Sequence, residues 1–331
     1  MESPSTTAHI DVIRVLAPAK LNLRLKIVGR RTDGYHLLNM LNVTTSLCDE
    51  IEIEFRNAPY IGIDVQGEIS RALRQELLDP RKNLAAKAAK LFLDEFGIQA
   101  GVYLQITKRI PAGSGLGGGS SDAAAVLRAL LDHFMQKVGR EKSIFKKIER
   151  LAVKLGADVP YLLRGGLALV QGVGELITNL PGSFLHGTAA VLILPGCHLP
   201  TAQIYSLFRD RHPHPISFED TKLSRFVAYL NKDRCDPQSS RLTLYQELLA
   251  LVENDLCEAA CFYSNAVQEV LKRLRLLPGA KASMTGSGSA IFVLPNPPEL
   301  LTNQFLSAIE ERLRGLAVQI VPITLFANSC W

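Results

Sequence analysis

Residues 111–125 read Pro-Ala-Gly-Ser-Gly-Leu-Gly-Gly-Gly-Ser-Ser-Asp-Ala-Ala-Ala, a glycine-rich stretch that runs directly into an alanine-rich segment. The preceding residues 102–106 (Val-Tyr-Leu-Gln-Ile) have the composition of a β-strand. Glycines let a loop turn tightly and bring its N–H groups against a ligand, and the first turn of a following helix adds positive potential. A strand, a glycine loop and a helix in this order predict an anion site for the phosphates of a nucleotide. The alternative is a glycine-rich surface loop without a ligand.

Three common nucleotide-binding patterns do not fit this context. Gly113, Gly115 and Gly118 have the spacing of the dinucleotide fingerprint, but residues 136–142 are basic where that fingerprint requires an acidic residue at a strand end. Gly119 stands where a Walker loop has its lysine. The chain also lacks the His-Arg-Asp and Asp-Phe-Gly motifs of protein kinases. The context therefore excludes a dehydrogenase of the dinucleotide-binding type, a protein with a Walker loop and a protein kinase.

The loop resembles the phosphate loop of the GHMP kinase superfamily, which contains galacto-, homoserine, mevalonate and phosphomevalonate kinases. Three further segments carry the resemblance. Residues 17–23 (Ala-Pro-Ala-Lys-Leu-Asn-Leu) with 29–36 (Gly-Arg-Arg-Thr-Asp-Gly-Tyr-His), residues 156–160 (Gly-Ala-Asp-Val-Pro) and residues 283–290 (Ser-Met-Thr-Gly-Ser-Gly-Ser-Ala) follow in the family's order. The first of these segments is similar to that of the 4-diphosphocytidyl-2-C-methyl-D-erythritol kinase family of the non-mevalonate isoprenoid pathway.

The resemblance implies an α+β protein with the two-domain GHMP kinase fold and an active site in the cleft between the domains. Residues 1–180 are expected to form an ATP-binding domain like domain 2 of ribosomal protein S5, and residues 181–331 a ferredoxin-like α/β domain that completes the substrate and phosphate sites. Periodicity in the sequence predicts helices over 83–96, 120–134 and 143–155, and strands over 11–28, 41–45, 49–55, 102–107, 190–194 and, as the final strand, 290–294.

The resemblance also implies the reaction, in which ATP phosphorylates the 2-hydroxyl of 4-diphosphocytidyl-2-C-methyl-D-erythritol and Mg²⁺ shields the phosphate charge. Phosphoryl transfer needs positioning, charge stabilisation and a group that accepts the alcohol proton. Asp158 matches the family's catalytic aspartate, whereas its spacing alone favours a loop carboxylate with local hydrogen bonds. Lys20 lies in an apolar strand, where an inward-facing lysine needs an anionic partner and an exposed lysine does not. By resemblance, Lys20 pairs with Asp158 and orients the hydroxyl.

The substrate residues follow from the same resemblance. Asn22 is two residues from Lys20 and is therefore expected on the same strand face, where its amide can hold a hydroxyl or phosphate. Tyr35 and His36 match the family's cytosine-recognising pair, although residues 33–36 alone read as an ordinary turn. Thr201 and Tyr205 resemble the far wall of the cytidine pocket.

On the nucleotide side, the expected contacts come from the loop and its neighbours. Ser120 or Ser121 is expected to cap the helix and touch phosphate or Mg²⁺. Asp122 is expected to cap the first helix turn rather than bind metal. Gly286 and Gly288 are expected to let a second loop approach the first. The full nucleotide set is Asn83, Lys108, Pro111, Gly113, Ser114, Gly115, Leu116, Gly117, Gly118, Gly119, Ser120 and Ser121; no protein metal ligand is expected.

Composition narrows the partners and the compartment. The chain has 331 residues, 47% of them hydrophobic, and a net charge of +5, which is too small and too scattered to indicate nucleic-acid binding. No long apolar run predicts a membrane span, and residues 1–10 lack the features of a secretory signal. Six scattered cysteines favour a reduced protein, although Cys257 and Cys261 have a spacing that could ligate a metal. We expect a cytoplasmic enzyme that is a monomer or a weak homodimer.

Two alternatives remain open on the sequence. The first is another GHMP kinase that acts on mevalonate, homoserine or a sugar, and Tyr35-His36 argues against it because those substrates have no base. The second is a catalytically silent nucleotide-binding module, and the presence of both Lys20 and Asp158 argues against it.

Overall fold

The computed structural model describes residues 11–138, 142–212, 221–232 and 241–328. The predicted features of residues 1–10, and the residues Cys235 and Cys330, lie outside these ranges. The chain divides into two compact units. The first comprises Met1–Ala17, Cys48–Arg109 and Gly119–Val159, and the second comprises Pro18–Leu47, Ile110–Gly118 and Pro160–Trp331. This partition differs in its boundaries from the predicted domains 1–180 and 181–331. The assignment of ATP binding to the first domain and of the substrate site to the second stays a prediction.

Two long strands, β1 (Val12–Arg30) and β2 (His36–Arg56), contribute residues to both units. In the first unit, the end of β2 pairs antiparallel with β4 (Gly101–Lys108), and β4 pairs parallel with β3 (Ile61–Gly67). Ile51 and Ile53 alternate with more exposed glutamates, as expected of a strand with one face in a core. Sequence patterning placed 41–45 and 49–55 in separate strands, whereas the structure makes one continuous strand of them.

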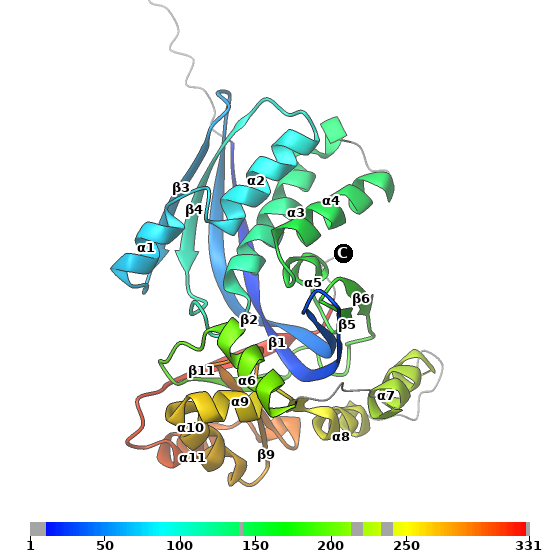
Figure 1. The fold of residues 1–331 in the computed structure, drawn as a ribbon, viewed down its shortest axis with the longest axis vertical. Coiled ribbons are helices and arrows are strands. Elements are labelled where there is room, and N and C mark those ends of the chain that lie inside the picture. The colour runs from blue at the N-terminus through cyan, green and yellow to red at the C-terminus, as the bar shows by residue number, and fades with distance from the viewer. Residues whose placement is uncertain (1–10, 139–141, 213–220, 233–240, 329–331) are drawn as a thin grey trace, which may run out of the picture. The chain divides into compact units, whose positions relative to one another are not determined.

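Helices cover one face of these strands. Figure 1 shows α2 (Leu84–Glu95), α3 (Gly118–Val138) and α4 (Lys142–Leu155) together on that face, while the shorter α1 (Arg71–Leu77) contacts β3. The apolar stripes of the helices supply the core of the unit, for example through Phe92 of α2 and Leu130 of α3. The three helices predicted from periodicity are confirmed, with ends that differ by a few residues.

The second unit is built on antiparallel strands in the order β9–β10–β7–β11–β2. The predicted strands at 190–194 and 290–294 correspond to β7 (Ala189–Leu194) and β10 (Ile291–Pro295). The other strands are β5 (Ala168–Gly172), β6 (Leu176–Asn179), β8 (Glu253–Asn254), β9 (Ala280–Met284) and β11 (Gln319–Phe326). The strand at 290–294 is therefore not the last one, and that prediction is wrong.

The missed strand β11 contains a proline, which weakens a strand pattern in the sequence. Pro322 pairs with Val191 of β7, whereas β2 pairs with β11 only at Leu325 and Phe326. At the proline, the strand therefore has a paired neighbour on one side only, which tolerates the missing N–H.

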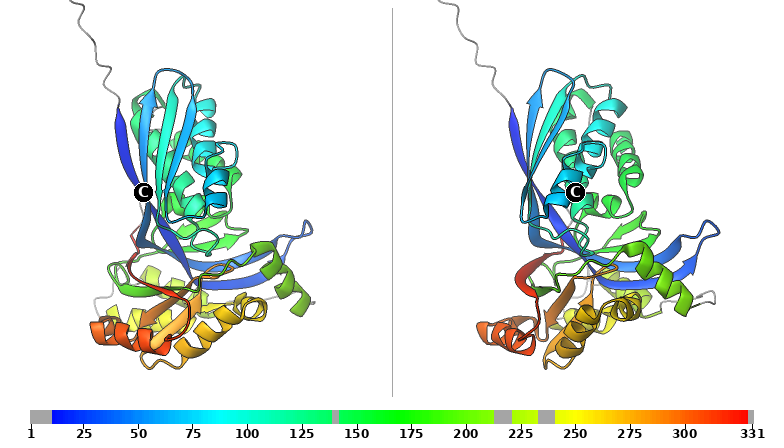
Figure 2. Two further views of the ribbon diagram at one scale, coloured as in Figure 1. Left: turned by 90° about the vertical axis from the view of Figure 1, so that its left-hand side faces the viewer. Right: turned by 60° about the vertical axis from the view of Figure 1, so that its left-hand side comes forward.

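Helices pack against these strands. α10 (Asn265–Arg275) contacts β9, α9 (Cys257–Tyr263) and α11 (Asn303–Arg312), seen as the gold to orange helices in Figure 2. The remaining helices of the unit are α5 (Val159–Arg164), whose first residue belongs to the first unit, α6 (Thr201–Arg211), α7 (Thr221–Lys232), α8 (Arg241–Leu251) and the short 3₁₀ turn Pro298–Leu300. The mixture of helices and mainly antiparallel strands confirms the predicted α+β class. Within the described ranges, none of the helices combines the length and the apolar character that crossing a membrane requires.

Candidate active site

One face of β1 carries polar side chains at every second position. Lys20, Asn22 and Arg24 are buried, with 4, 1 and 2% of their surface exposed, and Lys26 follows two residues later. The leucines between them lie in the core, because successive side chains of a strand point to opposite faces. The predicted common face of Lys20 and Asn22 is confirmed, since Lys20 Nζ donates a hydrogen bond of 2.6 Å to Asn22 Oδ1.

The amide of Asn22 is held by two residues that sequence reasoning missed. Its Nδ2 donates to Asn42 Oδ1 of β2 at 2.7 Å, and its Oδ1 accepts from the Thr285 hydroxyl at 3.3 Å. The backbone N–H of Asn22 also donates to Thr285 Oγ1 at 2.9 Å. Because both ends of the amide are engaged, its oxygen is fixed in front of Lys20. Thr285 lay within a recognised motif, but nothing local in the sequence pointed to Asn42.

The glycine loop is fastened on both sides within the second unit. The Lys20 N–H donates to Leu116 O at 3.0 Å, which ties the loop to β1. The Ala290 N–H donates to Ser114 O at 3.0 Å, which ties the loop to the segment that follows β9. The Leu116 side chain is fully buried in the core. The loop is therefore held in one conformation by backbone hydrogen bonds and by an apolar anchor.

Gly115 and Gly286 allow this loop and the turn after β9 to approach closely. Both have positive φ, +81° and +58°. A Cβ on Gly115 would lie 2.3 Å from Thr285 O, and one on Gly286 would lie 3.0 Å from Gly115 O and 3.4 Å from Lys20 Nζ. The predicted approach of Gly286 to the phosphate loop is confirmed. Gly288 approaches the loop as well, since a Cβ on Gly115 would lie 3.1 Å from Gly288 O, and a Cβ on Gly288 itself would lie 2.7 Å from Met284 Sδ.

The other loop glycines have different surroundings. Gly117 has φ +75°, and a Cβ there would lie 3.1 Å from Lys20 Cγ. Gly113 has φ +65° and faces the His198 ring. Gly119, in the first turn of α3, is exposed, and a Cβ there would make an ordinary van der Waals contact with Leu84 Cδ1 at 3.8 Å. No protein atom in the described ranges therefore requires a glycine at position 119.

The serines and the proline of the loop region differ in their accessibility. The Ser114 hydroxyl donates to Pro111 O at 2.6 Å, which closes a local turn. Ser121 is buried and Ser120 is half-buried, both in the first turn of α3. Gly118 is the first residue of α3, so the backbone N–H groups of Gly118 and Gly119 belong to the helix N-terminus that attracts anions.

The predicted cytidine residues come together in part. The rings of His36 and Tyr205 lie 5.1 Å apart with a tilt of 31°, and Phe208, which sequence reasoning missed, meets the His36 ring edge-on at 6.2 Å. Burial lowers the pKa of His36, and the positive charges of Arg30 and Arg209 lower it further. At neutral pH the imidazole is therefore uncharged and can both donate and accept a hydrogen bond.

The other two predicted cytidine residues, Tyr35 and Thr201, contact other parts of the chain. Tyr35 is 65% exposed in the turn between β1 and β2, where its N–H donates to Asp33 Oδ1 at 3.3 Å. Thr201 begins α6, and its hydroxyl shares a hydrogen bond of 2.8 Å with the Ser287 hydroxyl. Thr201 therefore joins α6 to the turn that contacts Lys20.

In the first unit, Lys108 lies between two buried carboxylates. Its Nζ donates to Asp122 Oδ2 at 2.7 Å and pairs with Asp49 Oδ2 as well. The expected capping role of Asp122 is wrong: it is the fifth residue of α3, beyond the first turn, and it binds Lys108. Burial raises the pKa of Asp122 to about 7, with the Asp49 charge adding to the effect and Lys108 opposing it. Burial opposes the charged form of Lys108 too, but the two carboxylates outweigh it and raise the pKa of the lysine.

Asn83 and Asp158 are also in the first unit. Asn83 caps α2, accepting from Ala85 N at 2.9 Å and donating to Leu77 O at 3.0 Å. Its side chain thus has a structural role, and its contact with nucleotide stays a prediction. Asp158 is half-buried in the turn between α4 and α5, where Val159 N donates to Gly156 O at 3.2 Å. The catalytic role of Asp158 stays a prediction.

The described residues include no group of three or more histidine, cysteine, aspartate or glutamate side chains that could hold a metal ion. Asp122, the carboxylate closest in sequence to the loop, is engaged by Lys108. The donors at the start of α3 are hydroxyls, which suit Mg²⁺ that arrives with ATP rather than a resident metal. Cys257 and Cys261 do lie one helical turn apart in α9, as free thiols whose pKa values burial raises.

A strand, a glycine loop and a helix N-terminus beside a buried lysine define a nucleotide-binding phosphotransferase of the GHMP type. Residues 83–166 match the family described as GHMP kinases N terminal domain. The chain is 36% identical over 283 residues to 4-diphosphocytidyl-2-C-methyl-D-erythritol kinase of Geobacter sp. (strain M21), a match that covers 85% of this chain and 89% of the relative. It is 37% identical over 282 residues to the kinase of that name from Clostridium tetani (strain Massachusetts / E88), covering 85% and 90%.

Solved structures agree with the sequence relatives. A crystal structure of 4-(cytidine 5'-diphospho)-2C-methyl-D-erythritol kinase has a TM-score of 0.68 and 32% sequence identity, and covers 95% of this chain and 99% of its own. The chain belongs to the 4-diphosphocytidyl-2-C-methyl-D-erythritol kinase family of the GHMP kinases. The predicted GHMP kinase fold is thereby confirmed.

Proposed function

We propose that the protein transfers the γ-phosphoryl group of ATP to the 2-hydroxyl of 4-diphosphocytidyl-2-C-methyl-D-erythritol, giving the 2-phosphate and ADP, a step of non-mevalonate isoprenoid precursor synthesis. The observation that carries the proposal is the buried network of Lys20, Asn22 and Thr285 beside the glycine loop. Family membership supports the choice of substrate, because two sequence relatives and one solved structure bear this enzyme's name.

The chemistry needs few groups. Asp158 takes the proton of the 2-hydroxyl while a bond forms between that oxygen and the γ-phosphorus, and the bond from the γ-phosphorus to the β,γ-bridging oxygen breaks so that ADP leaves. Lys20, oriented by Asn22, stabilises the negative charge on the transferred group. The N–H groups of Gly117 to Gly119 and the hydroxyls of Ser120 and Ser121 hold the triphosphate. The hydroxyls of Ser120 and Ser121 would also face a Mg²⁺ ion bound to ATP, which would shield the phosphate charge.

The cytidine end of the substrate is assigned to four residues. His36, uncharged at neutral pH, can read the edge of cytosine with one donor and one acceptor. Tyr205 and the exposed Tyr35 supply aromatic surface for the base. Thr201, next to Ser287, offers a hydroxyl for the ribose or the diphosphate. Such a base-reading set has no use for mevalonate, homoserine or a simple sugar.

The setting of the enzyme is proposed from its chemistry. It acts in the cytoplasm, where ATP is available, with Cys48, Cys197, Cys257 and Cys261 as free thiols. It works on small molecules, without nucleic acid or membrane, as a monomer or a weak homodimer.

A coupled ADP-release assay with a panel of acceptors tests the proposal. The cytidine diphosphate substrate should support turnover, while mevalonate, homoserine and galactose should not. Turnover with one of the other acceptors would indicate the alternative GHMP kinase. ATP binding without turnover on any acceptor would indicate the silent module.

A further inference from the structure

We infer that Asn254 is a positioning residue of the proposed phosphoryl transfer, because its side-chain amide holds the turn after β9 against Lys20 and the glycine loop. The inference rests on the proposed function for its kinetic test. Asn254 belongs to β8, 30 residues before that turn in the chain, and none of the motifs recognised in the sequence contains it.

The amide of Asn254 is fully engaged by the segment it holds. Its Nδ2 donates to Met284 O at 2.8 Å and to Gly286 O at 2.9 Å, so one NH₂ group bridges the two ends of the turn. Its Oδ1 accepts from Leu256 N at 2.9 Å, which fixes the orientation of the amide. The side chain is buried, and unpaired carbonyls left in such a place are costly.

The held turn touches the reacting side of the unit. Gly286 lies so close to Lys20 that a Cβ there would be 3.4 Å from Lys20 Nζ. Thr285, between the two carbonyls that Asn254 binds, hydrogen bonds to Asn22, and Asn22 binds Lys20. A shift of the turn would therefore move both the lysine and its orienting amide.

Asn254 is itself anchored to the strand that carries Lys20. β8 pairs parallel with β1, with Arg24 opposite Glu253. Arg24 forms an ion pair with Glu253, and Lys26 Nζ donates to Asp255 Oδ1 at 2.7 Å. The polar face of β1 therefore has two parts. Lys20 and Asn22 lie next to the turn, whereas Arg24 and Lys26 bind the residues on either side of Asn254, which holds the turn.

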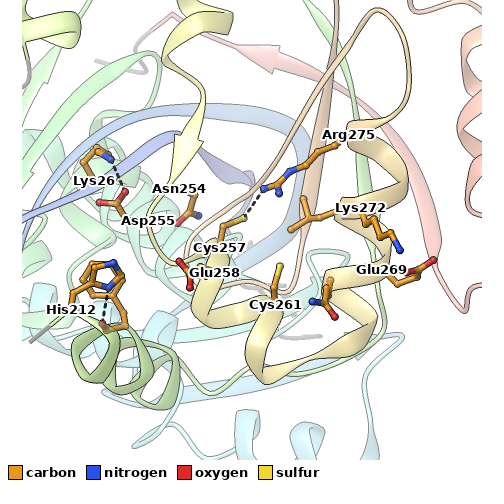
Figure 3. A pocket seen from close by; sticks show the side chains of 13 residues that line it. Lys26, His212, Asn254, Asp255, Cys257, Glu258, Cys261, Glu269, Lys272 and Arg275 are labelled. Atoms are coloured by element: carbon orange, nitrogen blue, oxygen red, sulfur yellow. Dashed lines mark hydrogen bonds and ion pairs between the residues drawn. The ribbon is translucent and has the colours of Figure 1, made fainter.

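The surroundings of Asn254 make two substitutions usable, the isosteric Asn254→Asp and the truncation Asn254→Ala. A pocket of about 1050 Å³ lies beside it, lined also by Lys26, Asp255, Cys257 and Arg275. Figure 3 shows Asn254 at the wall of this pocket, between the Lys26–Asp255 pair and Cys257. Space on this side means that Asn254→Asp and Asn254→Ala create no overlap. Asn254→Asp keeps the acceptor for Leu256 N but replaces the NH₂ group by an oxygen that repels both carbonyls.

Two measurements test the inference on the full-length protein. Steady-state kinetics should give a kcat at least about 10-fold lower for both Asn254 variants, because small misplacements of reacting groups are costly. The KM for the cytidine substrate should change less than kcat: the His36 ring, which reads the base, packs on Tyr205 and Phe208, whereas the cytidine residue bonded to the turn, through Ser287, is Thr201. Hydrogen exchange should be faster at Thr285, Gly288 and Ala290, whose N–H groups are hydrogen-bonded in the turn region.

Tyr245→Phe is the matched control for lost stability. It removes a buried hydrogen bond of the same unit, Tyr245 Oη to Pro295 O at 2.7 Å, without touching the turn. It should keep the wild-type kcat and wild-type exchange at the turn. Wild-type kcat and exchange in the Asn254 variants, or equal losses in Tyr245→Phe, would overturn the inference.

Two further outcomes are separable. If both Asn254 variants fail to fold, Gly286→Ala tests the same placement from the other side, and wild-type kcat there would overturn the inference. If the wild-type protein transfers no phosphoryl group, the proposed function fails, while hydrogen exchange at residues 285–290 still decides whether Asn254 positions the turn.

Discussion

Asp158 lies half-buried in the turn just before α5 and is the carboxylate proposed to accept the proton of the 2-hydroxyl. If it takes the proton of the 2-hydroxyl, Asp158→Asn should lower kcat by roughly 10²–10⁴-fold, because the amide cannot act as a base. Calorimetry should find the Kd for ATP unchanged. Near-wild-type turnover in the variant would remove Asp158 from the mechanism.

His36 gives a second prediction for a single residue, based on its lowered pKa. His36→Ala should raise the KM for the cytidine substrate by roughly 5- to 150-fold, equivalent to 1–3 kcal/mol for a buried base edge left unpaired. The KM for ATP should not change. His186→Ala is a suitable control, because that ring packs on Phe326 in the same unit.

The pH dependence of the wild-type enzyme checks the protonation state of His36. Burial and two arginines lower its pKa, so the imidazole stays neutral to a lower pH than a free histidine. The KM for the cytidine substrate should therefore rise on acidification with an apparent pKa below 6.5, the ordinary value for histidine. A KM that already rises well above pH 6.5 would contradict a lowered pKa for His36.

At the scale of an element, the glycines of the phosphate loop separate into two kinds. Gly115→Ala places a Cβ 2.3 Å from Thr285 O at φ +81°, and should cost about 1–3 kcal/mol of unfolding free energy in urea titrations. Gly119→Ala meets nothing within 3.8 Å and should stabilise α3 by about 0.5–1 kcal/mol.

The same pair of variants locates the triphosphate. If ATP occupies the space beside Gly119, the stabilised Gly119→Ala variant should bind ATP about tenfold more weakly, a difference of ~1.4 kcal/mol. Calorimetry with a non-hydrolysable ATP analogue measures this. Unchanged affinity in Gly119→Ala would mean that the phosphates lie away from the start of α3.

The start of α3 also carries a pH-dependent contribution to stability. The pKa of Asp122 is about 7 in the folded protein and ordinary in the unfolded chain, so its contribution is full below about pH 4 and is lost as the pH rises to about 7. Asp122→Asn removes that dependence. The stability of the variant relative to wild type should therefore rise between pH 4 and 7, by at most about 1.4 kcal/mol per pH unit. A difference that is flat or falls with pH would contradict the raised pKa.

Local periodicity was enough to predict the longer helices of the first unit and several of the strands. The helices at α2, α3 and α4 follow from apolar spacing, and the buried strands β7 and β10 from uninterrupted apolar runs. β11 was missed because Pro322 interrupts its pattern and because the unpaired side that tolerates a proline is a property of the sheet. Partners distant in the chain, such as Asp49 for Lys108, were missed because only strand pairing brings them together.

At the scale of the whole molecule, the candidate site draws on segments from residue 20 to residue 289. Lys20, Asn22, the glycine loop and the turn after β9 could be predicted as parts of the site, because they lie in motifs that resemble those of the GHMP kinases. Asn254 belongs to no such motif, and only the pairing of β8 with β1 brings it to the turn. The proposed roles of Asp158 and of the cytidine residues remain predictions.

The central claim is that this chain phosphorylates one particular hydroxyl of a cytidine diphosphate substrate. Its most direct measurement is ³¹P NMR of the protein incubated with MgATP and 4-diphosphocytidyl-2-C-methyl-D-erythritol. The account predicts a new phosphomonoester resonance on the 2-oxygen, with ADP formed in equal amount and the cytidine diphosphate signals retained. Loss of the ATP γ-phosphate as inorganic phosphate alone, or a phosphomonoester on any other hydroxyl, would contradict it.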